Sequence, residues 1–360
     1  MINSKIFQDR LELIKEKIVE NNLSAFLISN PMNIRYLTGF EPFLISERES
    51  MLIVDRKASY LYLPRAYEMM SPKIRGLKIK IIFEWAKIFE EISKQLKKYR
   101  GKIGFEPENL KFDEYKILKK GISFFAKKDF VNEMREIKDE KEILNIKMAF
   151  EITDRLFKRI LKFIKPGIRE NQISFKLKEL MEELGAQGPS FEPIVAFGEK
   201  TSQPHCFAGD RKLRKNEPIL IDFGVKFNGY CSDFTRMVYL GKVPKLFKER
   251  YKIVQEAQTI AIETIRPGIL AENIHKVVFK SLGKEAKNFF HATGHGVGLE
   301  PHEKPFLKKG IKEEIKENMV LAIEPGLYYK KYGIRIEDCG LVTKKGFKIL
   351  SKVKNDLIEI

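Results

Sequence analysis

Residues 218–240 read PILIDFGVKFNGYCSDFTRMVYL. Two runs rich in β-branched and aromatic residues flank Asn228-Gly229, a pair that two-residue type I′ turns favour because both positions need a positive φ. The stretch therefore predicts a β-hairpin. Counting outward from the turn places Phe223 opposite Phe234.

The same register brings two acidic residues together. Asp222 and Asp233 would point to one side of the hairpin as a diagonal cross-strand pair, with Gly224 opposite Asp233. Like charges so placed require a cation or a shared proton. A metal site is one interpretation and a solvated hairpin edge is the other, and the hairpin alone leaves both open.

Histidines add weight to the metal interpretation. Of the five in the chain, three lie in FFHATGHGVGLEPHEKP (His291, His295 and His302) and one in QPHC (His205). Such clustering is more typical of metal binding or acid–base chemistry than of core packing. GHGVG also resembles part of a phosphate-binding loop, but a lone glycine cluster is a weak signal.

Two glutamates complete the polar set. Glu324 ends the apolar run of MVLAIEPGLYY, and Glu337 follows alternating apolar positions in YGIRIEDCGLV. A carboxylate in an apolar strand needs a partner. The four carboxylates with one neutral imidazole carry a charge that two divalent ions would cancel, and this oxygen-rich set favours Mn or Co, with Zn as an alternative.

Composition limits the class of protein. The chain has 360 residues, which corresponds to roughly two domains. Its 43% hydrophobic and 32% charged residues exclude a disordered chain. No apolar run reaches the ~18 residues of a membrane span, and the charged start MINSKIFQDRLELIKEK differs from a signal peptide. Cys206, Cys231 and Cys339 are too few for a disulfide framework, so we expect free thiols and a cytoplasmic location.

The formal net charge of +18 raises the question of nucleic acid. Basic doublets such as Lys97-Lys98 are scattered among acidic neighbours, and no block of five or six basic residues occurs. The pattern favours a lysine-rich solvated surface over a nucleic-acid interface.

The first third of the chain alternates helical and strand patterns. Helical spacing over 7–20 and 84–99 alternates with the strand-like runs AFLIS, SMLIV and SYLYL. The charged stretch 133–147 then marks a change of composition. We therefore expect two domains, residues 1–130 and 131–360.

The second domain contains a repeat. Residues 164–176 read IKPGIRENQISFK and residues 265–280 read IRPGILAENIHKVVFK, each with an I-x-P-G-I start followed by Glu-Asn. The repeat predicts a duplicated half-domain. The alternative is two unrelated helix-Pro-Gly-helix turns.

Taken together, these motifs resemble the pita-bread metallopeptidases of the Xaa-Pro aminopeptidase and Xaa-Pro dipeptidase (prolidase) group. The resemblance rests on RLELIKEKIVENNLSAFLISNPMNIRYLTGF, GFEPENLKFDEY, EPIVAFGEKTSQPHC, LIDFGVKFNGYCSDFTR, HATGHGVGLEPHEKP, AIEPGLYY and GIRIED. It implies an α/β (α+β) fold, with a creatinase-like N-terminal α/β domain followed by a pita-bread domain of pseudo-twofold duplicated halves.

The resemblance also implies roles for individual residues. Two metals would be bound by Asp222, Asp233, His295, Glu324 and Glu337, with Asp233 and Glu337 bridging and a hydroxide held between the metals as the nucleophile. Glu324 would carry a proton to the leaving nitrogen. His205, His291 and His302 would bind substrate and stabilise the tetrahedral intermediate. Arg335 would orient a bridging carboxylate or contact substrate, or would simply pair with Asp338 or Glu337.

One departure affects substrate length. In some dipeptidases of this group an arginine soon after the HExP tract is implied to bind the free carboxylate of a dipeptide. Here Phe306 stands near that place, with Lys304 and Lys308 as substitutes, so aminopeptidase action on longer peptides is at least as well supported.

The expected protein is therefore a cytoplasmic homodimeric enzyme acting on proline-containing peptides, without membrane or nucleic-acid partners. The alternatives are a methionine-aminopeptidase-like activity and a basic, non-catalytic binding protein on the same fold.

Overall fold

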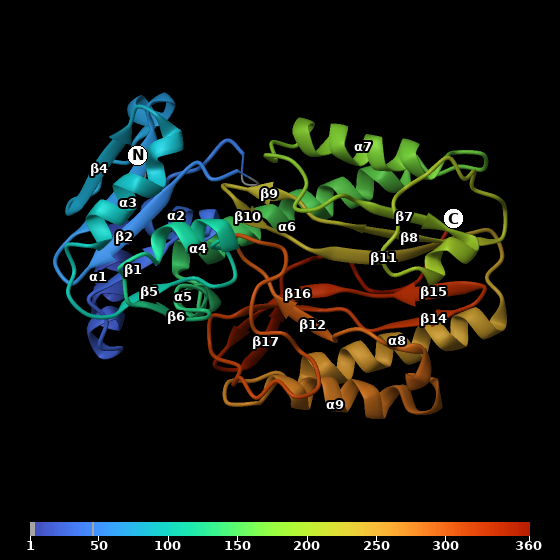
Figure 1. Cartoon of the computed structure of the whole chain (residues 1–360). Helices are drawn as coiled ribbons and strands as arrows, with labels where there is room; N and C mark the ends of the chain where they lie inside the picture. Colours follow the sequence, from blue (N-terminus) through green and yellow to red (C-terminus); the bar gives the residue numbers. More distant parts are fainter. Residues whose placement is uncertain (1–3, 45–46) are drawn as a thin grey trace. The chain divides into compact units, whose positions relative to one another are not determined.

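The computed structural model describes residues 4–44 and 47–360. The chain divides into two compact units, Met1–Arg135 and Glu136–Ile360 (Figure 1). Within the described ranges, no helix is both long enough and apolar enough to cross a membrane.

The first unit is built around a six-stranded mixed sheet of order β4-β3-β2-β1-β5-β6. Its strands are β1 (Ala25–Ile28), β2 (Met51–Asp55), β3 (Ser59–Pro64), β4 (Leu77–Ile82), β5 (Ile103–Phe105) and β6 (Phe124–Ala126). Its helices are α1 (Ser4–Glu20), α2 (Pro31–Thr38), α3 (Ile88–Leu96), α4 (Phe112–Leu118) and α5 (Asn132–Glu136), the last ending just past the division. The predicted alternation of helices and strands is confirmed. The α-helix α3 covers only Ile88–Leu96 and is shorter than the helix predicted over 84–99.

The second unit contains two pairs of helices and several short sheets. The helices are α6 (Glu140–Leu161), α7 (Glu170–Glu183), α8 (Lys245–Thr264) and α9 (Ala271–Leu282). The strands of one four-stranded sheet are β7 (Ile194–Phe197), β8 (Glu217–Phe223), β11 (Phe234–Leu240) and β18 (Ile358–Glu359). Those of the other are β12 (Gly294–Gly296), β13 (Val320–Ile323), β16 (Asp338–Thr343) and β17 (Gly346–Ile349). Two small hairpins complete it, β9 (Lys226–Phe227) with β10 (Tyr230–Cys231) and β14 (Gly326–Tyr329) with β15 (Tyr332–Arg335).

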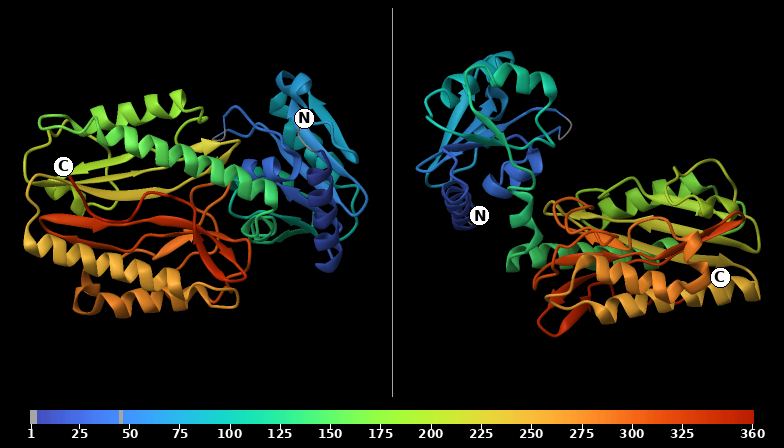
Figure 2. Two further views of the ribbon diagram at one scale, coloured as in Figure 1. Left: turned by 180° about the vertical axis from the view of Figure 1, so that it is seen from behind. Right: turned by 60° about the horizontal axis from the view of Figure 1, so that its bottom comes forward.

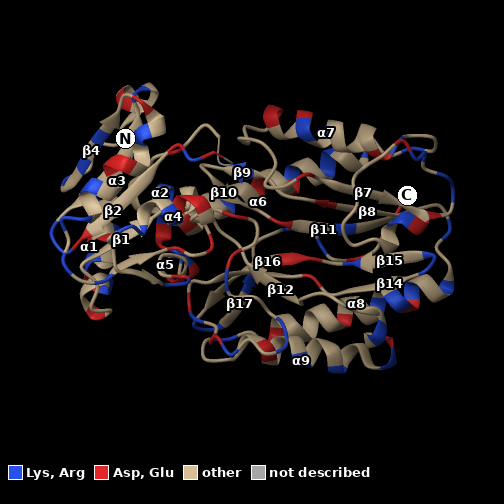
Figure 3. Cartoon of the chain, in the orientation of Figure 1, with Lys and Arg blue, Asp and Glu red and all other residues tan. Residues whose placement is uncertain are grey.

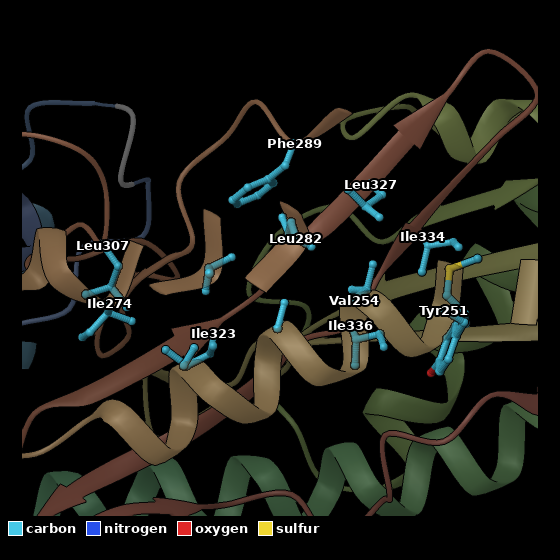
Figure 4. Close-up of a cluster of buried hydrophobic side chains, with 14 of the residues drawn as sticks. Tyr251, Val254, Ile274, Leu282, Phe289, Leu307, Ile323, Leu327, Ile334 and Ile336 are labelled. Atoms are coloured by element: carbon cyan, nitrogen blue, oxygen red, sulfur yellow. The ribbon is translucent and has the colours of Figure 1, made fainter. Parts of the chain in front are cut away.

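The strands of this unit lie between its two helical pairs. Helices α6 and α7 cover one outer side, and α8 and α9 cover the opposite side (Figures 1 and 2). Under α8 and α9, a fully apolar cluster joins helix to sheet, for example Val254 and Ile274 with Ile323 and Ile336 (Figure 4). Burial of such side chains excludes water from both helix–sheet layers and fixes the strands that carry the polar residues.

The predicted hairpin register is confirmed. Phe223 pairs with Phe234, and Asp222 pairs with Thr235 one step further out. Asn228 and Gly229 have φ values of 48° and 81°, as a type I′ turn requires. The register therefore runs without a slip from the turn to the acidic residues.

The two copies of the repeat adopt equivalent structures in the two halves of the second unit. Gly167 N donates to Leu213 O at 2.8 Å, and Gly268 N donates to Ile315 O at 2.8 Å. The bridge between Arg169 and Lys212 likewise has a counterpart between Leu270 and Glu314. These matched contacts confirm the duplicated half-domain.

The structure keeps the alignment of the two I-x-P-G-I starts. The matched turns align the first residue of α7, Glu170, with the first residue of α9, Ala271. The Glu-Asn pair of the second copy therefore lies one position further along its helix than that of the first.

Basic residues are spread over helices and loops of both units, with acidic residues between them (Figure 3). Acidic positions also occur along the central strands of the second unit, where Asp222, Asp233 and Glu337 are buried. Acidic residues are therefore concentrated in the buried part of this unit, where Arg236 and Arg335 are also buried.

Candidate metal centre

Five possible metal ligands come from five segments of the second unit. Asp222 lies in β8, Asp233 between β10 and β11, His295 in β12, Glu324 directly after β13, and Glu337 between β15 and β16. The strands thus gather side chains that are far apart in the sequence.

Their ligand atoms form two groups that share one residue. Asp222, Asp233 and Glu337 offer atoms that all lie within 4.8 Å of one another, and so do His295, Glu324 and Glu337. Because Glu337 belongs to both groups, its carboxylate could serve two neighbouring ions.

Thr235 ties Glu337 to the hairpin. Its Oγ1 donates to Glu337 Oε2 at 2.8 Å, and its carbonyl accepts from Glu337 N at 3.2 Å. Since Thr235 pairs with Asp222 across the hairpin, the two carboxylates are held by one stretch of backbone.

The buried carboxylates raise one another's pKa values. Burial, with the charges of Glu337 and Asp222, raises the pKa of Asp233 well above its ordinary value. Burial, with the charges of Glu324 and Asp222, does the same for Glu337. Burial raises the pKa of Glu324 to about 8. Bound cations would relieve this unfavourable accumulation of negative charge.

Asp222 carries a direct sign of a missing partner. Its Oδ2 accepts a hydrogen bond from Arg335, whereas its Oδ1 is buried without a hydrogen-bond partner among the described residues. Buried carboxylate oxygens are normally satisfied. The orphaned oxygen, together with the oxygen-rich donor set, fits a divalent ion.

His295 is poised as a neutral ligand. Burial, with the nearby His302, lowers its pKa to about 3. Its Nδ1 lies 3.1 Å from Gly296 O, so the tautomer protonated there leaves the Nε2 lone pair free. Nε2 lies 3.8 Å from Asp233 Oδ2 and 3.5 Å from Glu324 Oε1, on the side where an ion would bind.

The other three predicted histidines lie around this centre. The ring of His302 meets that of His295 at 4.2 Å between centroids, and its ligand atom also lies within 4.8 Å of those of Asp233 and His295. Burial lowers the pKa of His302, and burial with the charge of Arg335 lowers that of His291 to about 4. His205 lies on an exposed loop at the edge of the centre.

Arg335 pairs with a residue that the sequence did not indicate. Pairing with Asp338 or Glu337 was the structural alternative, and the observed partner is Asp222. Asp338 is instead paired with Arg236 at 2.5 Å. The Arg335 side chain points toward the hairpin. The side chains that follow it point alternately to opposite faces of the extended backbone.

Tyr328 was missed by the sequence reasoning. Arg335 Nη1 donates to its hydroxyl at 2.9 Å, and the hydroxyl lies 2.9 Å from His291 Nε2. His291 Nδ1 lies 2.8 Å from Ala292 O, so a consistent arrangement has Tyr328 donating to Nε2. Its position in AIEPGLYY, beside Glu324, was the only available signal.

All nine predicted site residues line one cavity of about 360 Å³. Its other lining residues are Phe191, Ile194, Pro204, Ala292 and Phe306. Phe306 was noted from the sequence, whereas Phe191 and Ile194 were not singled out because nothing local distinguishes them from core residues. The cavity therefore combines a strongly acidic floor with apolar walls.

The cysteines pack beside the centre. Cys339 Sγ lies 3.3 Å from Asp233 O, and Cys231 Sγ lies 3.6 Å from Leu299 O, both buried. Cys206 is half-buried. None of the three belongs to a potential metal-binding group within the described ranges.

Two family models match the chain. "Metallopeptidase family M24" matches residues 145–344, and "Creatinase/Prolidase N-terminal domain" matches residues 10–137. The two matches fall in successive parts of the chain.

Individual proteins match along nearly the whole length. An Xaa-Pro dipeptidase of Pyrococcus furiosus is 33% identical, with 98% of this chain and 100% of that protein covered. A solved structure of an Xaa-Pro dipeptidase from Bacillus anthracis superposes with a TM-score of 0.92 at 30% identity, covering 98% of this chain and 100% of that one. An X-Pro aminopeptidase structure from Thermotoga maritima gives 0.87 at 28% identity, covering 97% and 99%.

Proposed function

The chain belongs to metallopeptidase family M24, and from this premise we propose that it is a dinuclear metal-dependent exopeptidase that hydrolyses N-terminal Xaa-Pro bonds. The family resemblance and the predicted pita-bread fold behind a creatinase-type N-terminal domain are confirmed. The proposal for the reaction is carried by the convergence of five ligand residues on one cavity.

Asp222, Asp233, His295, Glu324 and Glu337 would hold two divalent ions, with Asp233 and Glu337 shared between them. Mn or Co suits this set, with Zn as the alternative, because carboxylates outnumber the single imidazole. Such ions lower the pKa of water and polarise a carbonyl oxygen, which supplies a nucleophile at neutral pH.

Glu324 is the proton carrier in this proposal. Its carboxylate lies beside His295 and lines the cavity, within reach of a bound substrate. The proline nitrogen leaves as a secondary amine and must be protonated. A carboxyl group that accepts a proton from the attacking water and passes it to this nitrogen serves that step.

Three histidines and an arginine would contribute to binding and orienting the substrate. His291 and His302, whose pKa values are lowered mainly by desolvation, can hydrogen-bond a substrate carbonyl and the oxyanion that develops from it. His205 would bind the peptide from the cavity edge. Arg335 keeps Asp222 and Tyr328 in place, and its contacts support an orienting role.

The preference for substrate length is proposed from the residues near Phe306. Phe306 lines the cavity where a carboxylate-binding arginine would be expected in some dipeptidases. Lys304 bonds Glu313 at 2.9 Å, and Lys308 lies 5.5 Å from the Phe306 ring centroid. These contacts favour aminopeptidase action on longer peptides, and dipeptidase action is the second candidate because the relatives carry both names.

Further parts of the proposal concern the whole protein. We propose a cytoplasmic homodimer in which residues 1–130 serve dimerisation and substrate access, and residues 131–360 carry the chemistry. The scattered basic residues support a solvated surface without a nucleic-acid partner.

The decisive experiment compares an Xaa-Pro dipeptide with an Xaa-Pro tripeptide, each incubated with the purified protein and added Mn or Co. Tripeptide cleavage supports the aminopeptidase, and cleavage of the dipeptide alone supports the dipeptidase. Removal of N-terminal methionine from peptides lacking proline would favour a methionine-aminopeptidase-like activity. Binding of RNA or ribosomes without any turnover would favour a basic binding protein.

Metal dependence is tested in the same assay. Chelation should abolish turnover, and Mn or Co should restore it. His295→Ala and Glu324→Ala should remove turnover in proteins that remain folded by circular dichroism. Full activity in metal-free protein would contradict the mechanism.

A further inference from the structure

The segment 203–209 carries His205 and has little regular structure to hold it. It lies between the 3₁₀ turn Gly198–Ser202 and β8. His205 is exposed, and Phe207 is 82% exposed. Cys206 and Ala208 are only partly buried against the two cores. Polar contacts to the backbone therefore add to this packing in fixing the segment that carries His205.

One end of this segment is held by the metal centre itself. Arg335 Nη1 donates to Pro204 O at 3.1 Å, while Nη2 of the same guanidinium donates to Asp222. The residue directly before His205 is thus tied to a ligand carboxylate through a single buried side chain.

The other end is held by a buried ion pair. Lys200 Nζ lies 2.6 Å from Glu170 Oε2 and donates to Phe207 O at 2.7 Å. Gly209 N donates to the same Glu170 oxygen at 3.1 Å. The Glu170 side chain is 0% exposed. The backbone is therefore fixed two and four residues beyond His205.

Glu170 also anchors this pair to the sheet. Its second oxygen, Oε1, accepts from Phe197 N at 3.0 Å, at the end of β7. The carboxylate thus receives three donors from β7, Lys200 and the His205 segment, which satisfies both oxygens. Its buried charge is stabilised only while these donors stay in place.

The duplicated half shows that the fold does not require this carboxylate. Ala271 occupies the position equivalent to Glu170 and is also fully buried. The backbone contacts of the two turns nevertheless match, since Glu170 N donates to Arg211 O at 3.2 Å and Ala271 N donates to Glu313 O at 2.9 Å. A small apolar residue is therefore sufficient to form the turn. The Glu170 carboxylate has a role that is specific to the first half of the duplicated domain.

We propose that the Glu170–Lys200 pair positions His205 for substrate binding, which rests on the proposed peptidase function. Neither residue lines the cavity, so both are positioning residues that act through the backbone of 203–209. Loss of Lys200 frees Phe207 O and loss of the Glu170 carboxylate frees Gly209 N, and in either case the His205 imidazole then samples positions away from the substrate.

A double-mutant cycle tests this coupling. Lys200→Met and Glu170→Gln should each lower kcat/KM for the Xaa-Pro tripeptide by about ten- to a hundredfold, the effect expected from a misplaced side chain. In a His205→Ala background the same substitutions should change kcat/KM by less than about twofold, because the group they position is absent. Lys200→Arg should restore much of the activity. Equal losses in both backgrounds would overturn the proposal.

Hydrogen–deuterium exchange gives a readout independent of turnover. In metal-free Lys200→Met and Glu170→Gln, amides of residues 203–209 should exchange about tenfold faster than in wild type, while those of β8 stay protected. Lys178→Met is the matched control, because Lys178 lies on α7 with Glu170 and pairs with Glu192 in an exposed ion pair. Unchanged exchange in 203–209 would contradict the proposal. If the wild-type protein cleaves no Xaa-Pro peptide, the proposed function fails, and this measurement alone decides whether the pair holds the segment.

Discussion

Arg335 donates to Asp222 across 113 positions of the sequence, and both side chains are buried. The same guanidinium also reaches Tyr328 and the backbone of Pro204. A planar group with several donors in fixed directions can make these contacts at once, whereas an ammonium group cannot.

Arg335→Lys should therefore keep the positive charge and lose the geometry. We expect kcat/KM for an Xaa-Pro peptide to fall by about a hundredfold. The metal content, measured by elemental mass spectrometry, should stay near that of the wild type because the five proposed ligand residues remain. Unchanged kinetics would show that charge alone is sufficient at this position.

Gly224 has no side chain, so the backbones of the two hairpin strands can approach each other closely near Asp222. A Cβ on Gly224 would lie 1.9 Å from Ser232 O and 2.2 Å from Ser190 Oγ. Gly224→Ala should destabilise the protein by about 2–3 kcal/mol through overpacking and weaken metal binding. Urea unfolding and metal titration measure the two effects.

Gly310→Ala is the control for that substitution. Its added Cβ meets nothing within 4 Å, and only its φ of 86° opposes an alanine. We expect a cost of about 1 kcal/mol without an effect on metal affinity. Equal effects of both substitutions would contradict the steric explanation.

Lys138 and Glu303 form a buried ion pair of 3.2 Å, with side chains 1% and 5% exposed. Glu303 directly follows His302 in the sequence. Lys138→Met should remove the buried ammonium group from beside the Glu303 carboxylate and cost about 3–5 kcal/mol. Adding Glu303→Gln should recover part of the loss, as measured by the free energy of unfolding. A double variant less stable than Lys138→Met would argue against a paired charge.

Glu136 should make stability depend on pH. Burial, with the nearby charge of Glu313, raises its pKa to about 7, although three lysines oppose the shift. The folded state then binds more protons than the unfolded state between about pH 4.5 and 7, so this group lowers stability as the pH rises through that window.

Glu136→Gln removes that titration. The variant should match wild type near pH 4 and be more stable by about 1 kcal/mol at pH 8, a value reduced for partial solvation. Thermal unfolding at both pH values provides the comparison. A stability difference that does not vary with pH would exclude Glu136 as its origin.

The sequence by itself determined the hairpin and its register, and it predicted the candidate ligand residues. Asn228-Gly229 fixes the turn locally, and the two-residue period of a strand then sets which side each carboxylate faces. The repeat similarly predicted two matched turns, since a Pro-Gly pair constrains its own backbone.

Only the tertiary structure decided which distant side chains meet. The partner of Arg335, the position of Tyr328 between Arg335 and His291, and the apolar lining at Phe191 and Ile194 all depend on how separate segments pack. Local patterns specify the direction of a side chain along its own strand, but the position of one strand relative to another is set by the burial of apolar surface over the whole unit.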